Sequence, residues 1–211
     1  MVTDIEAPLT RGHRKKERTR KQLLEAGLRV LRTKGTAFKP KDVIEEAGVS
    51  TGTFYNYFTD TDVLIDEIMR DELLKMTSAT ASESIEDPAL RIAVSATRIL
   101  RRAAKDPLLS HFVLRLVYRP SESDQMTKYL RKDLVEGFET GRFTHSADDS
   151  TLDMSSGLLI MTIRRIASGN TQPDYIQMMI TRLLESLGIP NDEARQLAEA
   201  APALIPNTNK G

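Results

Sequence analysis

A short segment near the front of the chain concentrates uncharged side chains that form hydrogen bonds. Residues 50–58 read STGTFYNYF and contain no lysine, arginine or carboxylate. The hydroxyls of Thr53, Tyr55 and Tyr57 can donate to phosphate oxygens or read a base edge, and Asn56 can bond an adenine through two hydrogen bonds. Threonine methyls in the same segment can contact a thymine methyl. These groups are suited to contact with nucleic acid.

The surrounding residues predict how this segment is held. Residues 39–58 read as a helix, a tight turn and a second helix, with Gly48 suited to a left-handed position that costs other residues about 1 kcal/mol. Ser50 is a favourable N-cap, and the helix start offers N–H groups to a phosphate. Phe54 and Phe58 share one face, which we expect to pack inward. The polar groups then point outward, as in a helix-turn-helix that enters the major groove. A helical hairpin with its aromatic residues in the core is the alternative.

Other chemistry finds little support in the sequence. The chain has no cysteine, which excludes disulfides, thiolate metal sites and a cysteine nucleophile. The histidines at 13, 111 and 145 are scattered, so we expect no metal, and we expect no cofactor. The sequence contains no G-x-S-x-G, no phosphate loop of the G-x-x-x-x-G-K type and no H-E-x-x-H. We therefore expect that the protein is not an enzyme.

The charges are distributed unevenly along a chain of zero net charge. Residues 1–58 carry 12 basic and 7 acidic side chains, whereas residues 59–211 carry 18 and 23. Seven of the cations fall within residues 11–21, beside the single acid Glu17. Such a basic arm indicates contact with a polyanion, and an ordinary solvated arm is the alternative. If the partner is DNA, this arm, Lys39 and Lys41 would supply the salt-sensitive part of the affinity.

The chain gives no sign of a membrane segment. Its longest uncharged run is the 13 residues 47–59, too short and too polar for a span. Residues 1–10 lack the apolar region of a signal peptide. Apolar residues make up 40% and charged residues 28%, which favours a folded chain over a disordered one. We expect a cytoplasmic protein without a membrane partner.

Helical spacing of apolar residues predicts an all-α fold of about nine or ten helices. We place a helix-turn-helix domain with its basic arm at residues 1–60 and a helical body at residues 61–211. The Asp-Pro pairs at 87–88 and 106–107, a capping box of Ser146 with Asp149, and Asn191 or Asp192 are expected to start helices. The expected helices are 19–34, 39–47, 50–58, 62–76, 88–104, 107–119, 121–141, 146–168, 173–187 and 191–201.

An ordered set of residues between 18 and 64 carries a family resemblance. The set comprises Arg18, Thr19, Arg20, Leu23, Leu24, Ala26, Gly35, Val43, Glu46, Ala47, Gly48, Val49, Ser50, Gly52, Thr53, Phe54, Tyr55, Tyr57, Phe58 and Leu64. This pattern resembles the N-terminal domain of the tetracycline-repressor (TetR) family of bacterial transcription regulators, over about a quarter of the chain. The chain departs from the family at Gly27 and Ile44, where alanine is usual, at Lys39, where a threonine cap is common, and at Thr61, where a lysine often approaches a phosphate.

The resemblance implies a mechanism. The first three helices bind DNA, and the fourth joins them to a body that binds a small ligand and forms a homodimer through its last two long helices. Ligand binding changes the spacing of the two recognition helices and releases a pseudo-palindromic operator. The implied protein is a ligand-responsive dimeric regulator, expected to be a repressor. The DNA-contact residues are Lys39, Lys41, Ser50, Thr51, Thr53, Tyr55, Asn56 and Tyr57.

The helical body offers two sets of candidates. Apolar stripes along two late helices are candidates for a dimer interface, with a single-chain core as the alternative: Leu152, Ser156, Leu159, Ile163, Ile176, Met179, Ile180, Leu183 and Leu187. Candidates for ligand contact on the helices of residues 88–141, two of them arginines that could meet an anion, are Ile99, Arg102, Phe112, Arg115, Leu116, Tyr129, Leu134 and Phe138. Residues of these types more often form ordinary core or ordinary surface than a ligand contact.

Two further functions stay open. The chain could be a DNA-binding regulator without a small-molecule inducer, or a helical interaction module whose basic arm meets an acidic partner or a lipid. The arm is poor in apolar residues, which disfavours insertion into a membrane.

Overall fold

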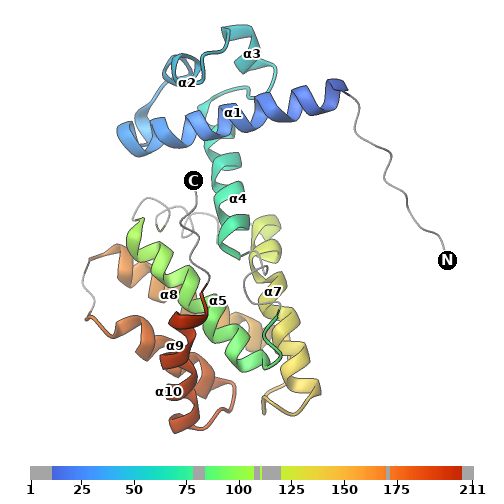
Figure 1. The fold of residues 1–211 in the computed structure, drawn as a ribbon, viewed down its shortest axis with the longest axis vertical. Coiled ribbons are helices and arrows are strands. Elements are labelled where there is room, and N and C mark those ends of the chain that lie inside the picture. Colours follow the sequence, from blue (N-terminus) through green and yellow to red (C-terminus); the bar gives the residue numbers. More distant parts are fainter. Residues whose placement is uncertain (1–10, 78–83, 107–109, 111–119, 170–171, 206–211) are drawn as a thin grey trace, which may run out of the picture. The chain divides into compact units, whose positions relative to one another are not determined.

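The computed structural model describes residues 11–77, 84–106, 110, 120–169 and 172–205, and these ranges are helical with short connections (Figure 1). They contain nine α-helices and no strand, which confirms the expected all-α fold for this part of the chain. The expected helix over 107–119 lies outside the described residues, apart from residue 110. No helix in the described ranges is long and apolar enough to cross a membrane.

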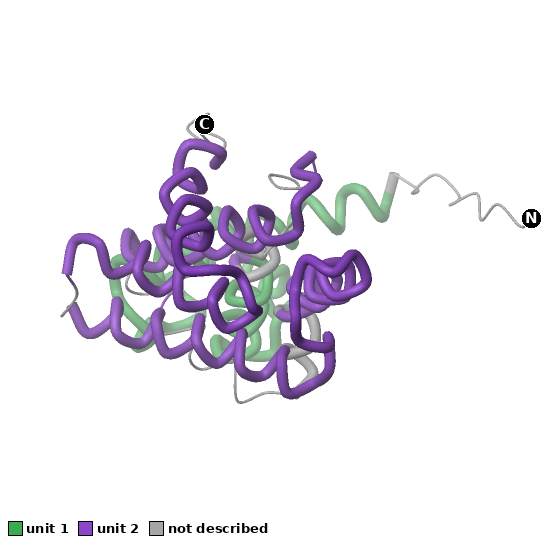
Figure 2. The backbone as a smooth tube through the Cα atoms, turned by 90° about the horizontal axis from the view of Figure 1, so that it is seen from below, with its two compact units in different colours: residues 1–71 green, residues 72–211 purple. Residues whose placement is uncertain are grey.

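The chain divides into two compact units, residues 1–71 and 72–211 (Figure 2). The division falls inside helix α4 (Thr61–Thr77). The domain boundary after residue 60 stays a prediction. Unit 1 also contains α1 (Arg11–Lys34), a 3-10 turn (Gly35–Ala37), α2 (Pro40–Ala47) and α3 (Thr51–Tyr55).

Helix α1 is longer than the sequence indicated. It begins at Arg11 rather than near residue 19, so the basic arm is helical where the structure describes it. The apolar stripe that revealed α1 starts at Leu23, because only from there on does the helix bury side chains in the core of unit 1. The preceding turns have no apolar periodicity, so their helical state was not visible in the pattern.

The core of unit 1 contains side chains from α1, α3, α4 and the segment between α3 and α4. Leu23, Phe54, Phe58 and Leu64 are each at most 1% exposed. Gly27 lies at the closest approach, since a Cβ built there would come within 2.7 Å of Cδ1 of Ile68. Glycine in place of the usual alanine therefore lets α1 and α4 pack closely, at a cost in helix propensity of about 1 kcal/mol.

Unit 2 is built around α5 (Pro88–Lys105), which packs against α7 (Pro120–Glu139), α8 (Asp149–Ala167), α9 (Tyr175–Ser186) and α10 (Asn191–Ala200). A 3-10 turn (Ala201–Leu204) also contacts α5 and α10. The buried face of α5 is rich in small side chains, which lets several helices approach it closely.

Two of the expected helix caps were wrong. The carboxylate of Asp148, not Ser146, caps α8 by accepting from the N–H of Thr151 at 3.0 Å, and Ser146 donates its hydroxyl to that carboxylate. Pro190 holds the cap position of α10, since Asn191 is the first helical residue, and the Asn191 amide donates to Glu185. The cap of α5 is confirmed, with Asp87 accepting from the N–H of Ala89 at 3.0 Å.

Two arginines tie the ends of the helices of unit 2 together. Arg91 on α5 donates to Asp133 at 2.7 Å and to Glu136 at 2.6 Å, both on α7. Arg142 donates to both carboxylate oxygens of Asp87, at 2.9 and 3.0 Å, and to Glu193 of α10 at 2.7 Å. Because each guanidinium is at most one quarter exposed, these pairs hold geometry more firmly than surface pairs do.

Candidate nucleic-acid interface

Helix α3 is a short helix fixed at its start and along one face. Ser50 is its N-cap, with the side-chain Oγ accepting from the N–H of Thr53 at 3.1 Å. The two hydroxyls of this pair also bond each other at 2.8 Å. Phe54 and Phe58 are 0% and 1% exposed, with ring centroids 5.9 Å apart, so they anchor the segment in the core. The predicted inward face is therefore confirmed.

The opposite side of this segment faces outward. Thr51 and Asn56 are exposed, and Tyr55 is 52% exposed although its ring meets Phe54 edge to face at 5.3 Å. Thr53 and Tyr57 are half-buried. The outward group thus consists of a hydroxyl, a phenol and an amide, none of which carries a charge. The Tyr55 phenol is therefore accessible to a partner.

The turn before α3 is fixed by backbone geometry and by one side chain from α1. Gly48 adopts φ 62° and ψ 36°, the left-handed conformation expected at this position. The amide Nε2 of Gln22 donates to the carbonyl of Ala47 at 2.7 Å, which satisfies a carbonyl at the end of α2. Sequence reasoning missed Gln22, because its partner lies 25 residues away and no local pattern marks it.

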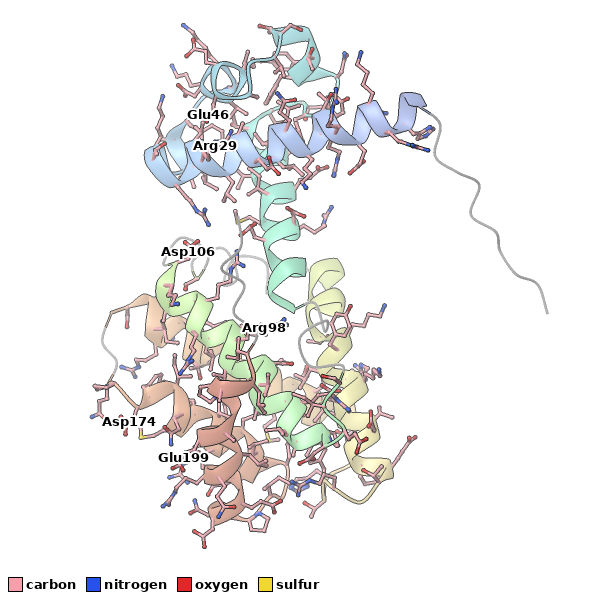
Figure 3. The ribbon with its side chains drawn as sticks, in the orientation of Figure 1. Arg29, Glu46, Arg98, Asp106, Asp174 and Glu199 are labelled. Atoms are coloured by element: carbon pink, nitrogen blue, oxygen red, sulfur yellow. The ribbon has the colours of Figure 1, made fainter. Side chains whose placement is uncertain are left out.

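Ion pairs also join α1 to α2. Arg29 meets Glu46 at 2.7 Å, and the two side chains lie where the helices face each other (Figure 3). Lys34 meets Asp42 at 2.5 Å, and Asp42 also accepts from the backbone N–H of Lys39 at 2.7 Å. The Lys34 ammonium and this N–H hold the pKa of Asp42 below its ordinary value. The start of α2 is therefore held in place on α1.

The predicted phosphate contacts at the start of α2 are exposed. Lys39 is the N-cap residue of α2, and Lys41 is the second residue of the helix, with its Nζ 3.6 Å from Oε1 of Glu45. At the start of α4, the carboxylate of Asp60 accepts from the N–H of Val63 at 2.9 Å, and this bond lowers its pKa. Thr61, at the position where the family often has a lysine, thus follows a capping carboxylate and supplies no positive charge.

The dimer candidates divide into two groups. Five of them are already buried within the single chain, at 0–6% exposure: Leu152, Ile163, Ile180, Leu183 and Leu187. They form core of the single chain and have little surface to offer a second copy. Ser156, Leu159, Ile176 and Met179 are half-buried. The large exposed apolar side chains of α8 and α9 are instead Met154, Met161 and Met178, at 42–52%.

The described ligand candidates differ widely in exposure. Leu134 is buried at 1%, whereas Tyr129 and Phe138 on the same helix are 37% and 45% exposed. Ile99 is half-buried, and Arg102 meets Glu72 at 2.6 Å, so that cation already has a carboxylate partner. Phe112, Arg115 and Leu116 lie outside the described residues. Where these side chains contact a ligand stays a prediction.

Unit 1 contains a helix-turn-helix whose second helix turns an uncharged polar face outward, and a larger helical unit follows it. This arrangement defines a class of transcription regulators in which one part of the chain binds DNA and the other part controls that binding. Residues 23–68 match the bacterial regulatory proteins of the tetR family, and residues 87–200 match the tetracyclin repressor-like C-terminal domain. The chain belongs to the tetracycline-repressor family. As a member it is a DNA-binding transcription regulator and not an enzyme.

Solved structures agree with this assignment. The crystal structure of RolR in complex with its ligand resorcinol is 27% identical, with a TM-score of 0.70 over 88% of this chain and 95% of that one. RolR without ligand is 25% identical, with a TM-score of 0.65 over 85% and 96%. TylP, a TetR regulator from Streptomyces fradiae, is 20% identical and shares the fold, with a TM-score of 0.64 over 89% and 96%. No curated protein matches the chain.

Proposed function

We propose that this protein is a dimeric repressor that reads a pseudo-palindromic operator with α3 and releases it when a small molecule binds unit 2. The observation that carries the proposal is the division of residues 50–58 into a buried aromatic anchor and an exposed, uncharged polar face. Because the protein acts on DNA, we place it in the cytoplasm.

Base reading is assigned to the exposed part of α3. Asn56 can bond an adenine edge, and Thr51 can offer its methyl to a thymine. Tyr55 and Tyr57 donate to phosphates or to base edges, while Ser50 and Thr53 serve the cap as well as the interface. Lys39, Lys41 and the basic start of α1 supply the salt-dependent attraction to the backbone.

The experiment is an anisotropy titration with the promoter DNA next to the protein's own gene. Specific binding at about 0.15 M salt, much tighter than binding to a shuffled duplex of equal length, is expected. The shuffled duplex is the matched control, because it keeps every phosphate and removes the sequence. Equal affinity for the two duplexes, measured with folded protein, would rule out operator recognition.

We place the dimer interface on the outer faces of α8 and α9. Met154, Gly157, Leu158 and Met161 follow one another at helical spacing along a single face of α8, and Met178 adds an exposed apolar side chain on α9. A Cβ built on Gly157 meets nothing within 4 Å, so the helix surface is open there to another backbone. Two copies related by a two-fold axis would cover this face, and the same axis would set the spacing of the two α3 helices.

Release by a small molecule follows from the family architecture and from the resemblance to RolR. RolR was crystallised with resorcinol and covers most of this chain at 27% identity. We therefore propose a small organic effector and name resorcinol as the first compound to test. It acts if it favours a conformer whose α3 helices no longer fit the operator, and the operator must then weaken effector binding by the same factor.

A titration of resorcinol into the protein–operator complex tests this release. Loss of the complex at a resorcinol concentration that leaves the protein folded is the expected result. If no small molecule of a wider set stabilises the protein in a thermal-shift measurement, the regulator without an inducer is favoured instead. If the basic arm prefers anionic vesicles to DNA at equal salt, the interaction module is favoured.

A further inference from the structure

One hydroxyl in the interior of unit 2 lacks a hydrogen-bond partner. Ser155 on α8 is 0% exposed, and its Oγ has no partner. The position lies on the face that α8 turns toward the core, together with Thr151, Leu152, Thr162 and Ile163. Ser155 therefore lies in the interior of unit 2.

The other buried hydroxyls of the described part of unit 2 are all bonded. Thr97, Thr162 and Thr181 each donate to the carbonyl four residues earlier in their own helix, at 2.7, 2.7 and 3.1 Å. Ser110 donates to the carbonyl of Ala103 at 2.8 Å, and Thr151 bonds Asp148.

Ser155 could use the same back-bond to the carbonyl of Thr151, which is the ordinary solution for a serine inside a helix. It does not, so its hydroxyl bears the cost of burial without a compensating bond. A polar group left in this condition requires an explanation, and a ligand is one that fits a regulator.

The surroundings define the chemistry that this hydroxyl would meet. The residues that α5, α8 and α9 bury are aliphatic side chains, alanines, a proline and hydroxyls, and none of them is charged. These three helices pack against one another. Among these side chains an uncharged molecule with one hydrogen-bonding group gives up less hydration than a charged molecule does. A hydroxyl both donates and accepts, so it matches a phenol, an alcohol or a carbonyl.

We propose that Ser155 is the hydrogen-bonding contact for the effector inside unit 2, and that the effector is a small uncharged molecule with a hydroxyl or carbonyl group on an apolar frame. This inference rests on the ligand response proposed above. Neighbouring atoms cover Ser155 completely, so the effector reaches it by displacing them. Binding is thereby tied to a change in the packing of unit 2, which is the kind of step that an effector must cause.

The first test needs no ligand. Ser155→Ala and the matched control Ser156→Ala are compared in full-length protein by urea unfolding. Both changes gain the same helix propensity, but Ser156 is half-exposed and donates to the carbonyl of Asp153 at 3.3 Å. The midpoint of Ser155→Ala is expected to exceed that of Ser156→Ala, because no bond is lost. A midpoint below both the control and the parent protein would show that the hydroxyl is bonded in the resting state and would overturn the proposal.

The second test uses phenol and toluene, which differ by a hydroxyl in place of a methyl group. Dissociation constants are measured by calorimetry for the parent protein and both variants. The preference for phenol over toluene is expected to fall about tenfold in Ser155→Ala and to stay unchanged in Ser156→Ala. An unchanged preference in Ser155→Ala, or no binding of either compound to the parent protein, would overturn the proposal.

Operator binding without ligand separates this inference from the proposed function. Ser155→Ala is expected to bind the promoter duplex as the parent protein does, because Ser155 lies in unit 2 and far in sequence from α3. If the phenol test fails while operator binding is intact, only the proposal that Ser155 contacts the effector is refuted. Failure of the parent protein to bind the operator removes the proposed function.

Discussion

Phe143 shows how a single residue type shapes unit 2. Its ring is 3% exposed and lies on the backbone of Gly137 in α7, where a built Cβ would come within 2.0 Å of the ring. The N–H of Phe143 also donates to the Gly137 carbonyl at 2.9 Å, which closes the end of the helix. Glycine is required at position 137 because the ring occupies the space of a side chain.

Gly137→Ala is therefore expected to destabilise the protein. The methyl group must displace a buried ring, which costs about 1–3 kcal/mol, against a gain of at most about 1 kcal/mol in helix propensity. Urea unfolding measures the difference. Gly52→Ala is the control, because a Cβ there meets nothing within 4 Å, and it should not lose stability. Equal stability of the two variants would show that Phe143 moves aside freely.

At the scale of elements, local signals predicted what local chemistry decides. Asp87 before a proline, Ser50 as a cap and Gly48 in the left-handed turn are each determined by their neighbours in sequence, and each was predicted correctly. The start of α8 was misplaced because Ser146 and Asp148 both offer cap oxygens, and the stronger acceptor of the two is the carboxylate.

Contacts between elements were harder to predict. The burial of Leu152, Ile163, Ile180, Leu183 and Leu187 depends on which helices surround α8 and α9, and the apolar stripe alone does not distinguish a core from an interface. The same holds for the ligand candidates of unit 2, since Leu134 and Phe138 lie on one helix and the first is buried while the second is exposed.

The cap of α8 should make the protein sensitive to acid. Hydroxyls of Ser146 and Ser150 and the N–H of Thr151 hold the pKa of Asp148 well below its ordinary value. A carboxylate with a lowered folded pKa stabilises above its unfolded pKa of about 3.9, and this stabilisation is lost as the pH falls through the folded value. Asp148→Asn should lower stability at neutral pH and flatten its decline below pH about 4.

Unfolding midpoints of the parent protein and Asp148→Asn, measured from neutral to strongly acid pH, check this expectation. Asp149→Asn is the control, since its exposed carboxylate lies one residue later. If the stability of the Asp148 and Asp149 variants declines in parallel as the pH falls, protonation of the Asp148 cap does not contribute to acid unfolding.

The exposed start of α1 should contribute to DNA affinity through charge alone. Lys15 and Arg18 are exposed and three residues apart, and Gln22 fixes the following turn of α1 to the end of α2, beside α3. Replacing both cations by glutamine should reduce the slope of log affinity against log salt by up to about 2, for operator and unrelated DNA alike. Lys128→Gln with Lys132→Gln on α7 removes the same charge from unit 2 and should leave the slope unchanged.

Anisotropy titrations at several salt concentrations measure these slopes. An unchanged slope in the variant that lacks the charges of Lys15 and Arg18 would show that these two side chains do not contact DNA.

In the proposed function two copies of the molecule act on DNA together, because a two-fold axis matches two α3 helices to one palindromic site. The open surface at Gly157 allows that pairing to be tested without disturbing the single chain. Gly157→Arg should separate the dimer, because an arginine placed between two apolar helix faces is desolvated without a partner. Ala104→Arg on the exposed side of α5 is the control.

Light scattering after size exclusion gives the mass, and circular dichroism reports folding. A folded monomer for Gly157→Arg and a dimer for Ala104→Arg is the expected pair of results. A dimer for both variants would place the interface elsewhere.

The central claim is that α3 reads base edges, and Asn56→Ala on matched duplexes tests it most directly. The affinity of the parent protein and the variant is measured for the operator and for operators with each A·T pair replaced in turn. The variant is expected to bind the operator about tenfold more weakly and to lose discrimination at one symmetric A·T position. If the variant binds as tightly as the parent protein and discriminates at every position, α3 does not read the sequence through Asn56.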